Sequence, residues 1–318
     1  MIIKFARYGL TILSIFFKND LKKIKEKHKK VSNELKEEMT KFNFTFFSRL
    51  KTHEIFSKNI YDIIIKNKTL NFLRNSNIQN IFFIHNRFFI LNELLELKRD
   101  IKRWSLWKTL LTENSVGDPV RYFLYPKSSG NRIRQVYHLK KYLDFSKNNI
   151  LKIKNIIEIG GGYGCMAQIF KKINKGCNYV IFDTAEVNLL QYYYLKMNNI
   201  PVTINKIQSK KVCLINKLSL IKKYNKKMNK RNVNLLIANW SISEMPIDLR
   251  NKINKLTYNF PNKLISFQEK FENINNLNYF LKYRDTLKKK IVKIEKHYHY
   301  KKSLLNNNNH FYFFSKEK

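Results

Sequence analysis

Glycine and proline are scarce in this chain of 318 residues, which contains 8 glycines and 5 prolines. Residues 1–112 contain a single glycine, Gly9, and no proline, so this region lacks the residues that most often interrupt a helix. Acidic residues are also few: 23 Asp and Glu stand against 62 Lys and Arg, which gives a formal net charge of +39. Such a charge attracts polyanions, but it is spread along the whole chain and so marks no particular binding surface.

The three cysteines are placed so that two common kinds of site are not expected. Cys165, Cys177 and Cys213 form no CxxC or Cys/His spacing, which argues against a zinc site and against a disulfide framework. The His, Asp and Glu residues show no metal-ligand spacing either. We therefore expect no metal, and a reducing, cytoplasmic compartment.

A long apolar run is missing from the N-terminus. The run at residues 8–17 is too short to span a bilayer, which needs about 20 residues, and a signal-peptide cleavage site does not follow it. Because basic residues stand on both sides, the run could lie flat on an anionic membrane face. The alternative is an amphipathic helix that docks on its own domain.

The distribution of turn residues divides the chain into three regions. Residues 1–112 carry apolar side chains at helical three-and-four spacing, which predicts a helical N-terminal region. Residues 113–145 contain glycines and prolines that separate short extended pieces, and we interpret them as a connecting or cap segment. Residues 146–318 alternate between strand-like and helix-like segments, which indicates an α/β domain with a parallel sheet.

Four of the scarce glycines stand together in "NIIEIGGGYGCMAQIF", residues 155–170. The pattern predicts a strand at 155–159, a tight turn at 160–164 and a helix at 165–173. Glycine permits a positive φ and lets a ligand approach the main chain, and the following helix directs N–H groups toward that ligand. This arrangement indicates a site for a nucleotide-type cofactor.

The spacing of these glycines separates the candidate cofactors. A dinucleotide motif would need Gly or Ala where Cys165 stands, and a P-loop would need G-K-[ST]. The run of an acid, one residue and G-x-G-x-G instead resembles motif I of class I S-adenosylmethionine-dependent methyltransferases. The residues that carry the resemblance are Glu158, Gly160, Gly161, Gly162 and Gly164. In that family they face the methionine part of S-adenosylmethionine, which is therefore the expected cofactor.

A second acid follows the next predicted strand. "NYVIFDT" ends at Asp183 and Thr184, with Asp183 standing 19 residues after Gly164. An acid at this strand end is placed to accept hydrogen bonds from both ribose hydroxyls of a cofactor, so we assign Asp183 and Thr184 to the cofactor site. The alternative for Asp183 is a turn or N-cap residue before the helix at 185–195.

A third segment narrows the resemblance. "NWSISEM", residues 239–245, follows a buried strand and looks like the "NSFQEM"-type segment of the sugar O-methyltransferase family. Ser243 stands where that family has glutamine, and Ile242 replaces an aromatic residue. The match covers roughly residues 113–275 and includes "EIGGGYG", "EVNLLQYYYL", "GDP" and "RIRQVYHL".

This resemblance implies a fold and a reaction. The fold would be a Rossmann-like class I methyltransferase sheet, mostly parallel, with helices on both faces and a helical region before it. "IVKIEKHYHY" and "HFYFFSK" would form a C-terminal antiparallel hairpin. The reaction would be methyl transfer from S-adenosylmethionine to a sugar hydroxyl of a glycan, a glycolipid or a nucleotide-linked sugar.

Candidate site residues lie after the predicted strands, because ligands of such sheets bind at the carboxyl ends. A sugar hydroxyl is a poor nucleophile while protonated, so a general base would help, and Glu244 and His138 are the candidates. Glu244 could instead cap the helix that follows it, and a lone histidine is more often structural. The other members of the site are Asn239 for the cofactor and Trp240, Ser241, Tyr137 and Gln268 for the acceptor.

Two arginines before the glycine turn have two interpretations. Arg132 and Arg134 could bind an acidic sugar or a diphosphate carrier in bidentate fashion. We expect instead that they lie on a solvated strand face.

Two other functions stay open. The positive charge could recruit RNA or DNA as the methyl acceptor, although the segment after the fourth strand is not D/N-P-P-Y/W and a Lys–Asp–Lys–Glu set is not evident. The chain could also be a non-catalytic, basic, membrane-docked binding protein, but the intact glycine turn and Asp183 argue against that interpretation.

Overall fold

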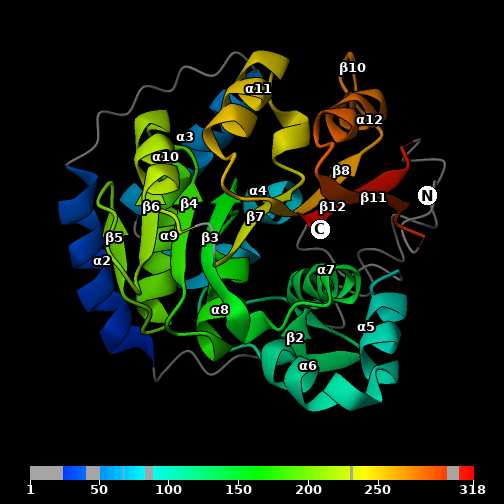
Figure 1. Cartoon of the computed structure of the whole chain (residues 1–318). Coiled ribbons are helices and arrows are strands. Elements are labelled where there is room, and N and C mark those ends of the chain that lie inside the picture. The colour runs from blue at the N-terminus through cyan, green and yellow to red at the C-terminus, as the bar shows by residue number, and fades with distance from the viewer. Residues whose placement is uncertain (1–23, 41–50, 67, 83–88, 230–231, 299–307) are drawn as a thin grey trace. The chain divides into compact units, whose positions relative to one another are not determined.

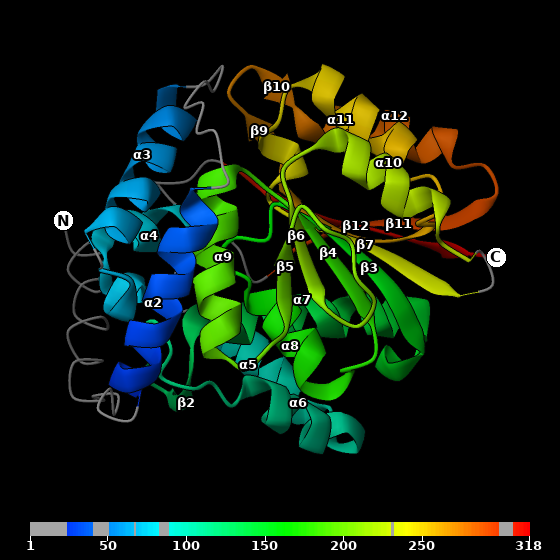
Figure 2. The ribbon, with the colours of Figure 1, turned by 90° about the vertical axis from the view of Figure 1, so that its left-hand side faces the viewer.

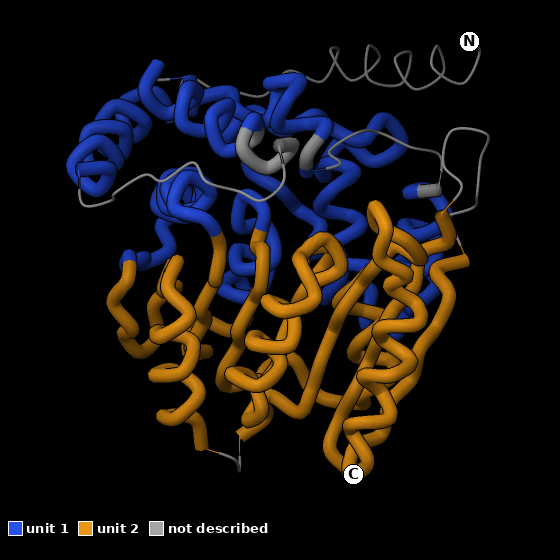
Figure 3. Tube along the Cα trace, turned by 90° about the horizontal axis from the view of Figure 1, so that it is seen from above, with its two compact units in different colours: residues 1–137, 162–172, 184–204 blue, residues 138–161, 173–183, 205–318 orange. Residues whose placement is uncertain are grey.

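The computed structural model describes residues 24–40, 51–66, 68–82, 89–229, 232–298 and 308–318. The apolar run at 8–17 therefore lies outside the described residues. The chain forms two compact units, which Figure 3 shows in different colours. The first comprises Met1–Tyr137, Gly162–Lys172 and Thr184–Ile204, and the second comprises His138–Gly161, Ile173–Asp183 and Asn205–Lys318.

The first unit is mainly helical in its described part, as predicted for the N-terminal region. Its helices are α2 (Lys25–Met39), α3 (Lys51–Ile65), α4 (Ser76–Ile81), α5 (Phe89–Arg99), α6 (Trp104–Leu111), α8 (Cys165–Ile173) and α9 (Ala185–Met197). Two 3₁₀ turns, Thr69–Arg74 and Ile101–Arg103, join them. The short strands are β1 (Arg121–Tyr122), β2 (Tyr125–Ser129) and β5 (Val202–Ile204). Helix α7 (Gly130–Ser146) begins in this unit and ends in the second.

Aromatic and polar contacts hold α2 and the Thr69–Arg74 turn against α9. The His28 Nδ1 lies 2.7 Å from the Tyr193 hydroxyl, and Lys196 Nζ pairs with Glu34 Oε2 at 2.8 Å. The Phe72 ring meets the edge of Tyr193 and also that of Tyr163 in the glycine turn. Tyr163, which follows Gly162 in the glycine turn, is thus packed into the core of the first unit.

The second unit is built on a mostly parallel sheet (Figure 1). Its strands are β3 (Ile153–Ile159), β4 (Asn178–Phe182), β6 (Val212–Ile215), β7 (Val233–Asn239), β8 (Asn262–Gln268), β11 (Lys290–Lys296) and β12 (His310–Glu317). Their order is β11-β12-β8-β7-β3-β4-β6. Strand β12 runs antiparallel to both β8 and β11, whereas the pairs among β3, β4, β6, β7 and β8 are parallel. The predicted C-terminal antiparallel hairpin is therefore confirmed.

Helices cover both faces of this sheet, as predicted. Helices α10 (Leu218–Lys226), α11 (Ile247–Leu256) and α12 (Asn276–Thr286) lie along one face (Figure 2). On the other face the C-terminal half of α7 stacks Phe145 on Phe314 at 5.5 Å between ring centroids. Because the parallel strands are covered on both sides, they consist of almost continuous apolar runs.

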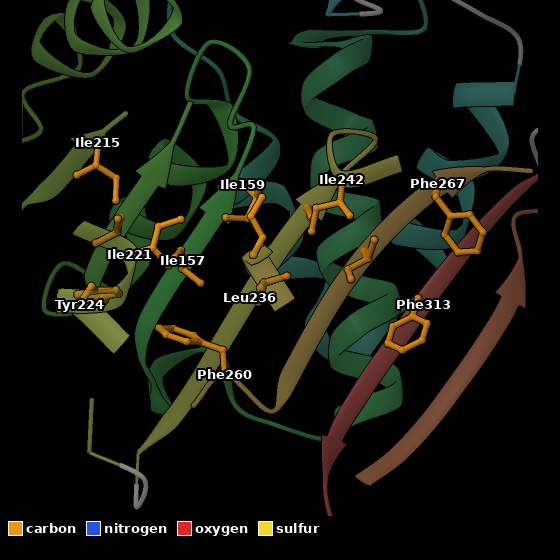
Figure 4. Packing of buried hydrophobic residues seen from close by; sticks show 14 of the residues in the cluster. Ile157, Ile159, Ile215, Ile221, Tyr224, Leu236, Ile242, Phe260, Phe267 and Phe313 are labelled. Atoms are coloured by element: carbon orange, nitrogen blue, oxygen red, sulfur yellow. The ribbon is translucent and has the colours of Figure 1, made fainter. Parts of the chain in front are cut away.

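Alternate residues of the strands build the apolar core under α10, α11 and α12 (Figure 4). Residues from the strands include Ile157, Leu236, Ile265, Phe267 and Phe313, all at most 1% exposed. The short connections complete the unit, namely the 3₁₀ turns Ile150–Lys152 and Ile242–Glu244 and the hairpin of β9 (Lys270–Phe271) and β10 (Ile274–Asn275). This core sets the positions of the strand ends.

The short extended pieces predicted for the connecting segment are present as β1 and β2, but the prediction is wrong from residue 130 onward, because Gly130–Ser146 form α7. Arg132 and Arg134 are 0% and 5% exposed, so they form no solvated face. The Arg132 guanidinium donates from Nε to Leu110 O at 2.6 Å and from Nη1 to Gln168 Oε1 at 2.7 Å. A helix buried on all sides lacks the amphipathic contrast by which helices are recognised in a sequence.

Candidate active site

The carboxyl ends of β3, β4, β7 and β8 lie at one edge of the sheet, because these strands are parallel neighbours. The segments that follow them are the glycine turn, Asp183, the run 239–245 and the residues after Gln268. Ligands of open α/β sheets bind at this edge. The structure thus gathers the three motifs found in the sequence.

The glycine turn after β3 needs its glycines for conformation and for space. Gly160, Gly162 and Gly164 have φ of +67°, +55° and +95°, which side chains rarely adopt. A Cβ on Gly160 would lie 2.3 Å from the Ser241 Cβ, and the Ser241 hydroxyl donates to the Ile159 carbonyl. The first glycine therefore admits the segment that follows β7.

The remainder of the turn leads directly into α8. Gln191 Nε2 donates to the Gly162 carbonyl at 2.8 Å, and Asn131 Nδ2 donates to the buried Tyr163 hydroxyl at 3.0 Å. Gly160, Gly161 and Gly162 are partly exposed, so their main chain is accessible to a ligand. Tyr163 anchors the turn, and the glycines before it present the backbone.

Two carboxyl groups lie beside the turn. Glu158 is 4% exposed and accepts a hydrogen bond from the Tyr179 hydroxyl at 2.8 Å. Burial raises the pKa of Glu158 to about 8, although the bond from Tyr179 lowers it, and the nearby charge of Asp183 raises it further. Glu158 is therefore a buried carboxyl under the turn.

Asp183 continues β4 beyond its last residue. Its N–H donates to the Ile215 carbonyl at 3.1 Å, and the residue is half-buried. The N-cap of α9 is the exposed Thr184, so the N-cap interpretation of Asp183 is wrong. A carboxylate at this strand end, partly open to solvent, can accept hydrogen bonds from a ligand.

Asn239 is the last residue of β7, and Trp240 follows it in a constrained conformation. The Ser266 hydroxyl donates to Asn239 Oδ1 at 3.2 Å. Trp240 has a φ of +69°, its N–H donates to the Ser266 carbonyl at 2.8 Å, and its ring centroid lies 4.3 Å from that of His310. Left-handed non-glycine residues are often found at functional sites. Trp240 is half-buried and leaves part of its surface exposed.

Glu244 ends the short turn after Trp240. Gln268 Nε2 donates to Glu244 Oε1 at 3.2 Å, and the Ser243 hydroxyl donates to Gln268 Oε1 at 2.8 Å. Burial raises the pKa of Glu244 to about 7, against the bond from Gln268 and the charge of Arg250, which lower it. The N-cap of α11 is Pro246, with no side-chain cap, so the capping interpretation of Glu244 is wrong.

The two departures from the sugar O-methyltransferase segment fall on core positions. Ile242 is 1% exposed and belongs to the apolar core. Ser243 is 0% exposed and holds Gln268. Neither side chain is at the surface of the site, so these two positions do not contact an acceptor directly.

His138, a candidate base, and Tyr137, a candidate acceptor contact, are core residues of α7. His138 is 1% exposed, and its Nδ1 lies 2.9 Å from the Tyr312 hydroxyl. Tyr137 is 2% exposed and donates to Glu96 Oε2 at 3.1 Å. The structure does not bring either of them to the exposed part of the site in the described residues.

Several partners of the site were missed from the sequence. They are Tyr179, Ser266, Arg250, Asn276 and His310, all of which contact site residues or each other. Arg250 lies in α11, the helix that follows Glu244. In a segment rich in lysine, the sequence gives no pattern that distinguishes a buried arginine from solvent-exposed basic residues.

Comparison with known proteins gives only distant likenesses. No protein-family model matches the chain, and no curated protein matches it. Among solved structures, "MtNAS in complex with MTA and tNA" is 11% identical, with 92% of this chain and 97% of that chain covered and a TM-score of 0.37. The methyltransferase domain of "bacterial-CtHen1-CN" is 15% identical (55% and 95% covered, TM-score 0.35). Precorrin-6y C5,15-methyltransferase from Geobacter metallireducens is 6% identical (56% and 87% covered, TM-score 0.36).

Similarities with such low sequence identity and TM-score assign no activity to this chain. Its fold class is therefore defined by the topology of the sheet. A parallel sheet with its last strand inserted antiparallel next to β8 is a Rossmann-like sheet of the class I methyltransferase type. In the described residues, a group of three or more His, Cys, Asp or Glu able to hold a metal is absent. The described helices include none that is long and apolar enough to cross a membrane.

Proposed function

We propose that this chain is an S-adenosylmethionine-dependent methyltransferase that methylates a sugar hydroxyl of a glycan, a glycolipid or a nucleotide-linked sugar. The observation that carries the proposal is the position of Glu244. Its carboxyl group, whose pKa is raised to about 7, accepts a hydrogen bond from Gln268. It lies at the same edge of the sheet as the ends of β3 and β4, which the glycine turn and Asp183 follow. The choice of a sugar rests on the resemblance of the run 239–245.

The residues at this edge suit the cofactor. Asp183 offers a half-buried carboxylate for the ribose hydroxyls, and the partly exposed Gly160 and Gly161 offer main chain for the methionine part. Asp183 and the deprotonated form of Glu244 place negative charge at this edge of a strongly basic chain, which suits a cationic ligand better than a phosphate. When bound, S-adenosylmethionine supplies an electrophilic methyl group.

Glu244 is the proposed general base. A carboxyl with a pKa of about 7 is divided between its two forms near neutral pH, which is the condition that favours proton transfer. Gln268 donates to one carboxyl oxygen, and the other can face the acceptor hydroxyl. Trp240 offers an aromatic face for the apolar side of a sugar ring, with Ser241 and Gln268 beside it.

Binding of S-adenosylhomocysteine tests the cofactor assignment. Calorimetry at moderate and high salt, with NAD as a control ligand, should give micromolar affinity that survives salt. Asp183→Ala should weaken binding at least roughly tenfold, because the ribose hydroxyls lose a charged acceptor. Asp285→Ala, which removes a carboxylate that is 67% exposed, should bind like the parent. Binding that salt abolishes, or that Asp183→Ala leaves unchanged, would contradict the proposal.

A second candidate keeps the cofactor and changes the acceptor to nucleic acid. The net charge of +39 favours it, since phosphate binding is driven by lysine and arginine and falls steeply with salt. Labelled S-adenosylmethionine offered with nucleotide sugars, glycolipids and total RNA separates the two. Label in RNA, at a rate that falls with salt, would replace the sugar assignment.

The compartment, the partner and the membrane contact are proposed from sequence features: the spacing of the cysteines, the resemblance of the run 239–245, and the apolar run at 8–17 with basic residues on both sides. We place the protein in the cytoplasm, with a sugar or glycan acceptor as its partner and a peripheral contact with an anionic membrane face. Flotation with anionic and neutral vesicles tests that contact, and equal recovery with both would remove it.

A further inference from the structure

The turn that carries Glu244 has little structure of its own. It consists of three residues, Ile242–Glu244, in 3₁₀ conformation, and short 3₁₀ turns have poor hydrogen-bond geometry. A general base must be held close to one geometry to act efficiently. Another part of the molecule must therefore fix the position of this turn.

Arg250 provides that support. It is 0% exposed, and its guanidinium donates from Nη2 to the Ser243 carbonyl at 2.6 Å and from Nε to the Met245 carbonyl at 2.7 Å. These two carbonyls flank Glu244 in the chain. The planar fork of one arginine thus holds the backbone on both sides of the carboxyl-bearing residue.

The same guanidinium ties the turn to the end of β8. Its Nη1 donates to Asn276 Oδ1 at 2.7 Å, and Asn276 Nδ2 donates to the Gln268 carbonyl at 2.9 Å. Gln268 is the residue whose side-chain amide meets Glu244. Arg250 and Asn276 therefore connect the backbone on both sides of Glu244 to the backbone of Gln268, and so link the two residues of the Glu244–Gln268 hydrogen bond.

We propose that Arg250 is a positioning residue that holds the Glu244 carboxyl against Gln268 for methyl transfer. The inference rests on the proposed function for the role of Glu244. Arg250 acts through the turn, since its three acceptors are Ser243 O, Met245 O and Asn276 Oδ1. Lysine could not replace it, because one ammonium group cannot reach three acceptors arranged around a plane.

Arg250 also contributes charge. The pKa of Glu244 is set by burial, which raises it, and by the amide of Gln268 and the charge of Arg250, which lower it. Arg250→Lys keeps the charge and removes the fork, whereas Arg250→Met removes both. The two variants therefore separate geometry from electrostatics.

The test compares the pH profiles of kcat for the parent, both Arg250 variants and Arg284→Lys. Arg284, which is 46% exposed at its side chain, is the matched control and should leave the profile unchanged. Arg250→Lys should lower the plateau of kcat roughly tenfold or more at an unchanged pH midpoint. Arg250→Met should lower the plateau similarly and move the midpoint upward by on the order of one unit. Affinity for S-adenosylhomocysteine should stay within about twofold in all of them.

Two further measurements keep the inference testable. If Arg250→Lys acts through Glu244, it should add no further loss to Glu244→Gln in the double variant. Asn276→Asp keeps the acceptor for Arg250 and removes the donor to Gln268, so it breaks the link to β8 without removing the arginine, and urea unfolding shows which of the variants are folded. Parental plateau values in Arg250→Lys or Asn276→Asp, or losses that add in the double variant, would overturn the inference.

Failure of the proposed function gives a different result. The infrared carboxyl band of Glu244, identified by its loss in Glu244→Gln, can be titrated without any acceptor. If methyl transfer is not found but Arg250→Met moves this titration upward, the reaction is wrong and the link between Arg250 and Glu244 is retained. If the titration does not move, the link itself is wrong, whatever the reaction.

Discussion

The two faces of the sheet in the second unit differ although the same strands form both. On β8, Ile265 and Phe267 enter the apolar core under α10–α12, whereas Ser266 and Gln268 alternate with them and point to the opposite side. Ser266 contacts Asn239, and Gln268 contacts Glu244. One face of a strand therefore stabilises the fold, and the other carries the polar groups of the site.

Strand register extends this difference across the sheet. Ser266 pairs with Asn239 on β7 and with Tyr312 on β12, and Gln268 pairs with His310. These side chains share a face because paired residues of neighbouring strands point the same way. On this face, the polar groups at the carboxyl ends of β7 and β8 are mostly buried, so they need partners at defined distances, and substitutions of these groups should change function more than stability.

The largest expected effect is on the polar face. Glu244→Gln removes the proposed base and should lower kcat roughly 10²–10⁴-fold, with S-adenosylhomocysteine affinity unchanged. In the parent, kcat should rise with pH through about 7, because the base acts only when deprotonated and its pKa is raised to about 7. The glutamine variant should lack this dependence. Unchanged turnover would remove Glu244 from the mechanism.

Adjacent residues of β8 give the next test. Phe267, 0% exposed, lies 4.2 Å from the ring centroid of Phe280, so Phe267→Ala should cost about 3–5 kcal/mol of unfolding free energy. Ser266→Ala removes one hydrogen bond to Asn239 and should cost about 1 kcal/mol. Urea unfolding measures both.

In ligand affinity the order of these two variants should be reversed, with the larger loss in Ser266→Ala. Ser266→Ala should weaken S-adenosylhomocysteine several-fold by releasing Asn239, and Phe267→Ala should leave affinity nearly unchanged at a temperature where it is folded. If the core variant loses more affinity than the serine variant, the division of labour between the faces is refuted.

The strand ends were predictable, because local sequence patterns determine them. The helix at 165–173 and the turn at 160–164 have the bounds expected from the glycines and the apolar spacing that follows. Burial on both faces made the strands apolar throughout, which distinguishes them from their surroundings. The antiparallel hairpin followed from two alternating segments at 290–296 and 310–317.

The contacts that hold the site were not predictable. Arg250 bonds to main-chain carbonyls and to Asn276, which is 26 residues away in the chain, so side-chain identities alone do not reveal the link. His138 was a candidate because histidine titrates near neutral pH, yet tertiary packing puts it against Tyr312. Residue types indicate the chemistry that is available, and only the packing determines which groups meet.

The last prediction concerns Glu158, a buried titratable group that pairs with Ile181 on β4 and Ile237 on β7. Its pKa is raised to about 8 in the folded chain, above the value of about 4.3 in an unfolded chain. The folded state therefore retains a proton that the unfolded state loses, so this stability is present below pH 4 and is lost as pH rises through 8. Glu158→Gln stays neutral and can still accept from Tyr179.

The advantage of Glu158→Gln in unfolding free energy should thus grow with pH, by on the order of 4 kcal/mol between pH 5 and pH 8.5. Urea unfolding at pH 5, 7 and 8.5 measures it. Glu317→Gln, at an exposed position of β12, is the control and should differ from the parent by a similar small amount at each pH. A pH-independent difference for Glu158→Gln would mean that this carboxyl is solvated, and the sheet would then be open at the point where β3 meets the glycine turn.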